Sequence, residues 1–115
     1  MASSSKGATN TQLRYFVALA RNLSYRRTAQ VLGISQPTLT AQINALEKSL
    51  GIALFERSRS GTLLSPEGRV LLPFAEETLQ ASVRFEEKAK DLAGGAQTTY
   101  RLGIPPTLGP YLLPY

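Results

Sequence analysis

Apolar residues recur at the spacing of an amphipathic helix in three stretches of the first half of the chain. The first stretch starts at Thr11, a residue type that caps helices, and ends near Asn22. Its apolar stripe consists of Leu13, Phe16, Val17 and Ala20. The pattern predicts a helix over 11–22, preceded by a flexible arm over 1–10 in which Ser, Ala, Gly and Thr dominate.

Two more helices are predicted directly after the first, with little chain between them. Ser24 can cap a short helix over 25–32, and Gly33 can take the left-handed conformation that ends a helix. Ser35 can then cap a longer helix over 36–50. Its stripe is Leu39, Ile43, Leu46 and Leu50. A short helix, a tight turn and a second helix form a helix-turn-helix unit.

A small hairpin and one long helix are predicted next. Two strand-like runs, 52–57 and 62–65, flank a turn at 58–61. Ser65 can cap a helix with proline at its first position, and the helical pattern lasts over 66–93 until a glycine pair breaks it. The fold class that we expect is therefore mainly α, with one hairpin.

Residues along the long helix repeat at alternating spacings of four and three, which is typical of a coiled coil. They are Leu71, Ala75, Thr78, Ser82, Phe85, Ala89 and Leu92. This face could pack only on its own domain, but a helix of roughly 42 Å is too long for three short helices to cover. We therefore favour a partner helix. The predicted dimerisation residues are Leu71, Phe74, Ala75, Thr78, Leu79, Ser82, Phe85 and Ala89.

The remaining residues resemble the beginning of another domain. The run from Tyr100 to Ile104 is strand-like, and a proline-rich stretch follows it. A single strand is not stable alone. We therefore expect 94–115 to be a hinge and the truncated start of a larger domain.

Basic residues concentrate in the first part of the chain. Residues 1–69 carry nine basic and three acidic side chains, a net charge of +6, whereas 70–115 carry four and five, a net charge of −1. This asymmetry favours an anionic partner for the first part. A solvated surface that happens to be basic explains the charge equally well when it is considered alone.

Several chemistries are excluded or disfavoured by the composition of the 115 residues. The chain has no Cys and no His, which removes disulfides, thiolate nucleophiles, Ser-His arrangements and the usual zinc sites. We expect no catalytic residue, no metal and no cofactor, and we assign an enzyme very little weight. There is no signal-peptide pattern and no apolar run long enough for a membrane span, so we expect a cytoplasmic location without membrane binding.

The outward residues of the helix over 36–50 suggest what the partner is. They are short, neutral and rich in hydrogen-bonding groups, namely Gln36, Thr38, Thr40, Gln42 and Asn44. Such side chains can contact base edges in the major groove of DNA. Arginines that can neutralise phosphates surround them, namely Arg26, Arg27, Arg57 and Arg59. The alternative is an ordinary helical hairpin with a polar surface, and we favour DNA.

A continuous resemblance from about Leu13 to Leu79 supports this interpretation. The residues that carry it are Thr28-Ala29, Leu32, Ser35-Gln36-Pro37-Thr38-Leu39-Thr40, Ile43, Leu46-Glu47, Leu50-Gly51, Leu54-Phe55-Glu56-Arg57, Leu64 and Ser65-Pro66-Glu67-Gly68. They are similar to the amino-terminal signature of LysR-type transcriptional regulators. The resemblance implies a winged helix-turn-helix DNA-binding domain over 11–65, a linker and dimerisation helix over 66–93, and the start of an effector-binding domain over 94–115. The run over 106–114 is similar to the hydrogen-peroxide sensors (OxyR type) of that family.

The resemblance also implies individual DNA contacts. Ser35, Gln36, Pro37, Thr38 and Thr40 match positions that meet bases or nearby phosphates. Arg27 matches a backbone-contacting position and Arg57 matches the wing arginine. The DNA-binding residues that we predict are Arg26, Arg27, Ser35, Gln36, Pro37, Thr38, Thr40, Gln42, Arg57 and Arg59.

Three positions depart from the family pattern. Relatives often have Ala in place of Thr28 and Arg in place of Ala41, so one contact of the family is missing here. The wing-tip arginine that enters the minor groove usually stands where this chain has Ser60, and we expect Arg59 to replace it.

The predicted partners and function follow from these residues and the resemblance. We expect sequence-specific binding of double-stranded DNA as a homodimer, with regulation of bacterial promoters as an activator or repressor. The resemblance further implies a tetramer of the full-length protein and RNA polymerase as a partner. Peroxide sensing would need cysteines outside these 115 residues. The alternatives are a relative that responds to a small metabolite, and a dimeric protein-interaction module without specific DNA binding.

Overall fold

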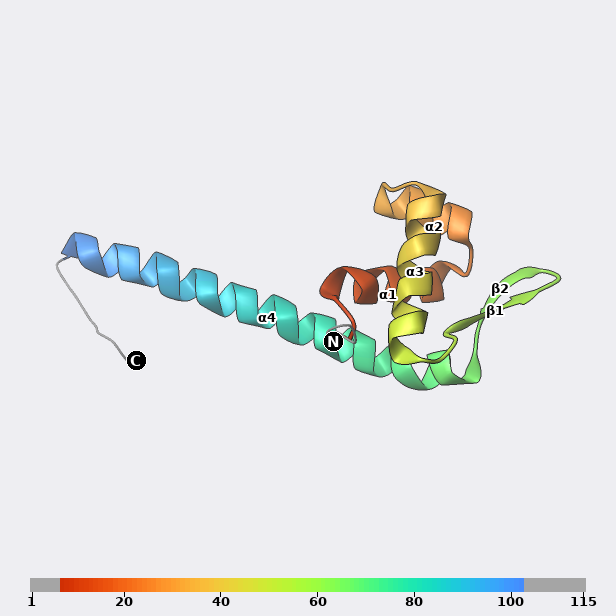
Figure 1. Cartoon of the computed structure of the whole chain (residues 1–115). Coiled ribbons are helices and arrows are strands. Elements are labelled where there is room, and N and C mark those ends of the chain that lie inside the picture. The colour runs from red at the N-terminus through yellow and green to blue at the C-terminus, as the bar shows by residue number, and fades with distance from the viewer. Residues whose placement is uncertain (1–6, 103–115) are drawn as a thin grey trace. The chain divides into compact units, whose positions relative to one another are not determined.

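The computed structural model describes residues 7–102, and it describes side chains as far as Gly94. Four helices and one hairpin follow each other along the chain (Figure 1). They are α1 (Asn10–Asn22), α2 (Tyr25–Leu32), α3 (Gln36–Leu50), β1 (Phe55–Ser58), β2 (Gly61–Leu64) and α4 (Pro66–Leu102). The chain forms two units, 1–79 and 80–115, whose boundary falls within α4. The first unit thus extends past residue 65, where we expected the DNA-binding domain to end.

Helix α1 begins at Asn10, so the predicted cap at Thr11 is wrong. The cap is Thr9, whose hydroxyl accepts a hydrogen bond from the Gln12 N–H at 3.1 Å. The Gln12 side chain accepts in return from the Thr9 N–H at 3.2 Å. Only Thr9 has a glutamine three residues later, and this reciprocal capping box decides the start of the helix. Within the predicted arm 1–10, Asn10 is therefore helical, and residues 1–6 lie outside the described part of the chain.

The predicted helix-turn-helix is confirmed in α2 and α3. The Ser24 hydroxyl accepts from the Arg27 N–H at 3.1 Å, and the Ser35 hydroxyl accepts from the Thr38 N–H at 3.2 Å. Gly33 closes α2 with a φ of 72°, which glycine adopts without steric cost. Helix α3 ends before Gly51 in the same way. The caps at Gly33 and Ser35 thus set the direction of α3 after the turn that follows α2.

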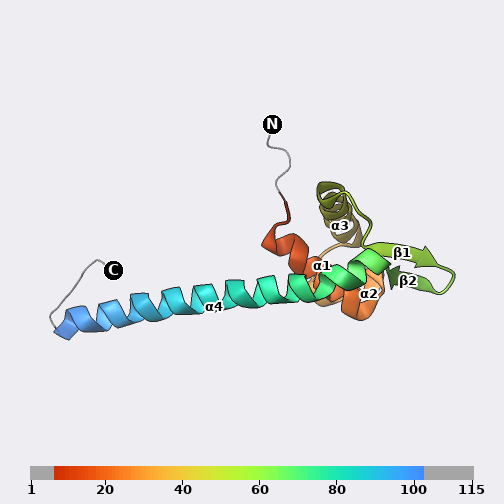
Figure 2. The same cartoon turned by 90° about the horizontal axis from the view of Figure 1, so that it is seen from below.

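The predicted hairpin is also confirmed, with shorter strands. Strands β1 and β2 are antiparallel, and Phe55 is paired with Leu64 and Ser58 with Gly61. Two residues, Arg59 and Ser60, form the connection. Seen from below, the hairpin extends away from the helices next to the start of α4 (Figure 2).

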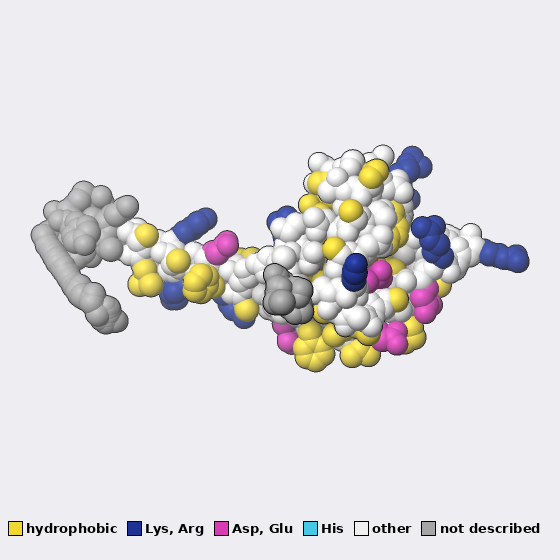
Figure 3. Space-filling view, viewed as in Figure 1, with side chains coloured by type: hydrophobic (Ala, Val, Ile, Leu, Met, Phe, Trp, Pro, Cys, Tyr) yellow, Lys and Arg dark blue, Asp and Glu magenta, His cyan; other side chains and the backbone are white. Residues whose placement is uncertain are grey.

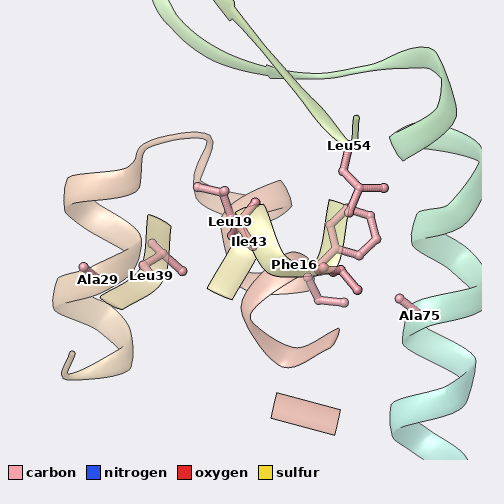
Figure 4. Packing of buried hydrophobic residues seen from close by; sticks show 9 residues of the cluster. Phe16, Leu19, Ala29, Leu39, Ile43, Leu54 and Ala75 are labelled. Atoms are coloured by element: carbon pink, nitrogen blue, oxygen red, sulfur yellow. The ribbon is translucent and has the colours of Figure 1, made fainter. Parts of the chain in front are cut away.

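The core of the first unit lies between α1, α2, α3, the base of the hairpin and the early turns of α4. Leu54 and Ala75 point towards Phe16, which lies between them (Figure 4). The rings of Phe16 and Phe55 meet edge to face with centroids 5.7 Å apart. The stripe residues Phe16, Leu39, Ile43 and Leu46 are buried, whereas Leu50, at the end of its stripe, is exposed.

Helix α4 is longer than the sequence predicts. It continues through the glycine pair to Leu102, so the predicted end at Ala93 and the predicted strand from Tyr100 are wrong as far as Leu102. A glycine weakens a helix by about 1 kcal/mol but does not forbid it, because its N–H and C=O still pair along the helix. The rest of the predicted strand and the proline-rich stretch lie outside the described residues. Between residues 7 and 102, no helix combines the length and the apolar character that a membrane crossing requires.

Candidate nucleic-acid interface

One face of α3 borders a shallow, open groove of about 510 Å³. Its lining residues are Gln36, Pro37, Thr40, Ala41 and Asn44. Gln36, Thr40 and Asn44 are four residues apart and therefore share one side of the helix. The adjacent side, about a quarter-turn away, carries the fully buried Leu39, Ile43 and Leu46, and this burial keeps the polar row at the surface. The row of Gln36, Thr40 and Asn44 therefore presents amide and hydroxyl groups on one side of the helix.

Two hydroxyls at the start of α3 form a directed hydrogen-bond chain. The Ser35 hydroxyl donates to the Thr38 Oγ1 at 2.8 Å, and both side chains are exposed. Because the Thr38 oxygen is the acceptor of this bond, its own hydrogen is free to point elsewhere. Ser35 thus caps the helix and also orients Thr38 as a donor towards an acceptor such as a phosphate oxygen.

Gln42 has a different environment from the other predicted contacts on α3. It is half-buried, and its side-chain oxygen accepts a hydrogen bond from Gln12 Nε2 at 3.3 Å. It is not among the residues that line the groove. Gln42 therefore links α1 to α3, and its DNA contact stays a prediction.

A second cleft of about 500 Å³ lies between α2, α3 and the hairpin. It brings together four of the predicted DNA-binding residues, namely Arg26, Gln36, Thr40 and Arg57. Both arginines are exposed and come from elements on opposite sides of α3 in the sequence. The cleft is therefore a polar recess with one guanidinium from α2 and one from β1.

The two remaining predicted arginines lie outside this cleft. Arg27 is exposed on α2, and Arg59 is exposed in the turn of the hairpin. Lys and Arg side chains project from the side of the unit that carries α2 and the hairpin (Figure 3). The structure thus places the four arginines on the elements that flank α3, as a DNA-binding surface requires.

The cleft also contains residues that the predicted DNA-binding set omits. Asn44 is one of the outward polar residues named from the sequence, and it continues the row of Gln36 and Thr40 at four-residue spacing. Tyr25 is half-buried in the cleft, and burial, followed by the carboxylate of Glu47, raises its pKa, whereas Arg57 lowers it. The phenol is therefore a neutral hydrogen-bonding group near neutral pH. Only the folded arrangement shows its closeness to Glu47 and Arg57.

The predicted dimerisation residues divide into buried and exposed members. Ala75 is 5% exposed because it completes the core of its own unit, and Leu71 and Leu79 pack against that core. We therefore correct Ala75 from an intersubunit contact to a core residue. Phe74 and Phe85 are 59% and 74% exposed, and Thr78 and Ala89 are also exposed, whereas Ser82 is half-buried.

Comparisons with known proteins identify the family of the chain. The family model of bacterial regulatory helix-turn-helix proteins of the lysR family matches residues 10–69. A probable hydrogen peroxide-inducible genes activator of Mycobacterium xenopi is 40% identical over 114 residues, which are 99% of this chain and 60% of that protein. The chain therefore spans less than two thirds of this relative.

Two solved structures are similar in fold. A Corynebacterium glutamicum OxyR mutant with bound hydrogen peroxide has a TM-score of 0.71 and 41% identity, over 76% of this chain and 27% of that one. A CbnR DBD–DNA complex has a TM-score of 0.70 and 35% identity, over 74% of this chain and 98% of that one. The matched family model spans more than half of the residues, and the chain therefore belongs to the lysR family of bacterial regulatory helix-turn-helix proteins.

Proposed function

We propose that this chain binds a specific double-stranded DNA site and regulates transcription from bacterial promoters. The observation that carries the proposal is the polar row of Gln36, Thr40 and Asn44, which lies between Arg26 and Arg57 in one cleft. A helix that presents amides and hydroxyls can enter the major groove and contact base edges. The similar CbnR DBD structure is a complex with DNA, which supports this role. Such a regulator would work in the cytoplasm and has no need of enzymatic activity.

The proposed DNA contacts are of different chemical kinds. Arg26, Arg27 and Arg57 neutralise phosphates on both sides of α3, and Thr38 donates its free hydrogen to a further phosphate or base acceptor. Arg59 extends from the turn of the hairpin towards the adjacent minor groove. In this arrangement the cleft between α3 and the hairpin accommodates the sugar–phosphate backbone of one strand.

The experiment that tests the proposal measures affinity for duplex DNA. A duplex that the protein selects from a randomised library is compared with a scrambled duplex of equal length. We expect Gln36→Ala to cost roughly 1–3 kcal/mol on the selected duplex and little on the scrambled one. The matched control is Gln30→Ala, since Gln30 is exposed on α2 and lines neither the groove nor the cleft.

Two results would count against parts of the proposal. We expect log K to fall linearly with log salt, because each neutralised phosphate releases counterions. A flat salt response would leave a protein-interaction module as the better explanation. Equal losses from Gln36→Ala on both duplexes would reduce Gln36 to a residue that positions the backbone.

We also propose that the chain forms homodimers through α4. Val70, Phe74, Phe85 and Leu92 are exposed apolar residues that lie four, eleven and seven residues apart along this helix. These spacings are close to whole numbers of turns, so the side chains share one stripe. A dimer would place two copies of α3 about one DNA turn apart, or a multiple of it, on a two-fold site.

The names of two similar proteins suggest the signal to which the intact regulator responds. The Mycobacterium xenopi relative is named for inducibility by hydrogen peroxide, and the similar OxyR structure contains bound peroxide. We infer that the regulator to which this DNA-binding unit belongs responds to peroxide. Transcription from the selected site in cells with and without added peroxide tests this inference, and an unchanged level would favour another effector.

A further inference from the structure

Glu47 accepts hydrogen bonds from four backbone N–H groups within five consecutive residues. Its backbone carbonyl accepts from Gly51 at 2.8 Å and from Ile52 at 3.3 Å. Its carboxylate Oε2 accepts from Leu54 at 2.7 Å and from Phe55 at 3.2 Å. One residue near the end of α3 thus binds most of the segment that leads into β1.

The carbonyl groups of the same segment accept hydrogen bonds from Ser65, the residue directly before α4. The Ser65 hydroxyl donates to the Ala53 carbonyl at 2.7 Å, and the Ser65 N–H donates to the Leu54 carbonyl at 2.9 Å. The Ser65 hydroxyl also accepts from the Gly68 N–H at 2.8 Å, which caps α4. The base of the hairpin is therefore held to α3 through its N–H groups and to α4 through its carbonyl groups.

Glu47 belongs to the row of α3 that faces the cleft. It follows Asn44 by three residues, as Asn44 follows Thr40 by four, so all three side chains share one side of the helix. Glu47 also lines the cleft. The last member of the row thus contacts the base of the hairpin with its carboxylate, whereas the earlier members present polar groups outward.

We propose that Glu47 is a positioning residue that sets the hairpin relative to α3, so that both elements engage DNA as one unit. The inference rests on the function proposed above. Phe55 is the first residue of β1, and its pairing with Leu64 forms the base of the hairpin, opposite the turn. Because the carboxylate binds the Phe55 N–H, it fixes the direction in which β1 carries Arg57 and leads to Arg59. Bonds from N–H groups to a carboxylate are stronger than neutral ones, so a charged residue suits this task.

The consequence is a coupling between Glu47 and Arg59 that DNA binding can measure. Arg59 contributes only if the hairpin holds it at the DNA. In the native chain, we expect Arg59→Ala to weaken binding to the selected duplex by about tenfold, the size of one hydrogen bond to a charged group. In a chain with Glu47→Ala, the same change should weaken binding by less than about twofold, because the hairpin is no longer held in place.

Two further variants separate positioning from other effects. Glu47→Gln keeps a side-chain oxygen that can accept the Leu54 and Phe55 N–H groups, so it should retain most of the Arg59 effect. Glu77→Ala removes the same charge from an exposed site on α4 and measures the effect of net charge alone. Circular dichroism of every variant at the assay temperature verifies that the helices remain folded.

Amide hydrogen exchange of the DNA-free chain tests the contact itself. Glu47→Ala should accelerate exchange at Leu54, Phe55 and the hairpin, and leave the central amides of α1 unchanged. Unchanged exchange at Leu54 and Phe55 would overturn the proposal. An equal Arg59→Ala effect in both backgrounds would overturn it too. If the native chain selects no duplex, the proposed function fails, and the exchange measurement still decides whether Glu47 holds the hairpin.

Discussion

At the scale of single residues, Thr28 shows how a polar atom in the core costs stability. Thr28 is fully buried on α2, and within the described residues its hydroxyl has no hydrogen-bond partner. A buried hydroxyl that exchanges water for no partner costs about 1–3 kcal/mol, whereas a methyl group of the same size does not. The methyl of Thr28 is buried favourably, whereas its hydroxyl lowers the free energy of unfolding.

We therefore expect Thr28→Val to stabilise the fold by about 1 kcal/mol, measured as the free energy of unfolding in urea. Thr28→Ser is the matched variant, because it keeps the hydroxyl and removes the methyl, and it should destabilise. A lower free energy of unfolding for Thr28→Val would mean that the hydroxyl does have a partner.

At the scale of elements, the first turn of α4 meets the base of the hairpin at Gly68. A Cβ atom at this position would overlap the carbonyl oxygen of Leu54 and lie 3.0 Å from the Leu64 side chain. The carbonyl of Leu54 is fixed by Ser65, so it cannot move away without breaking a hydrogen bond. The absence of a side chain at Gly68 is thus what allows α4 to approach.

We expect Gly68→Ala to lower the free energy of unfolding by about 3 kcal/mol, the upper end of the usual cost of overpacking. Gly94→Ala is the control, since a Cβ atom there meets nothing within 4 Å and alanine favours a helix. Urea unfolding followed by circular dichroism measures both. A Gly68→Ala protein as stable as the native one would show that the two elements separate easily.

Helices α1 to α3 and the hairpin show how much of the fold the sequence could predict. The turn between α2 and α3 and the hairpin are signalled locally by Ser24, Gly33, Ser35 and Gly61, and each local signal acts within three or four residues. Leu19 is fully buried although it lies beside the predicted stripe of α1. Helix α1 contacts both α2 and α3, and therefore it buries a wider face than one stripe.

The candidate site was predictable to a similar extent, because exposed residues on one helix face follow from spacing alone. The predicted groove residues Gln36, Pro37 and Thr40 lie together, and Asn44 completes them. Gln42 and Glu47 could not be assigned in this way. Their roles depend on Gln12 and on the segment before β1, and only the folded chain brings these partners to them.

At the scale of the whole molecule, the proposed dimer makes a prediction that two residues of α4 can separate. Phe85 lies on the exposed stripe and is 74% exposed, whereas Val83 is 53% exposed on another side of the helix. We expect Phe85→Lys to convert a dimer into a monomer, because it places a charge in the apolar contact. Val83→Lys should leave the dimer intact.

Sedimentation of the 115-residue chain measures the change directly. Binding to duplexes with one and two half-sites provides a second readout. The Phe85→Lys protein should lose the advantage of the second half-site, because linked binding depends on the dimer. Equal masses for the native and Phe85→Lys proteins would exclude this stripe as the dimer contact.

The burial of Ala75 in the first unit has a consequence for how such regulators diversify. Ala75 belongs to the core, and Leu71 and Leu79 pack against it, so a DNA-binding unit cut after the hairpin would lack part of its interior. A gene fusion that attaches a new sensory domain must therefore join downstream of Leu79. Every such recombinant inherits the early turns of α4, with Val70 and Phe74, from its DNA-binding parent. A junction between Leu79 and Phe85 would keep Val70 and Phe74 but replace Phe85, so the proposed dimer contact would then come from both parents.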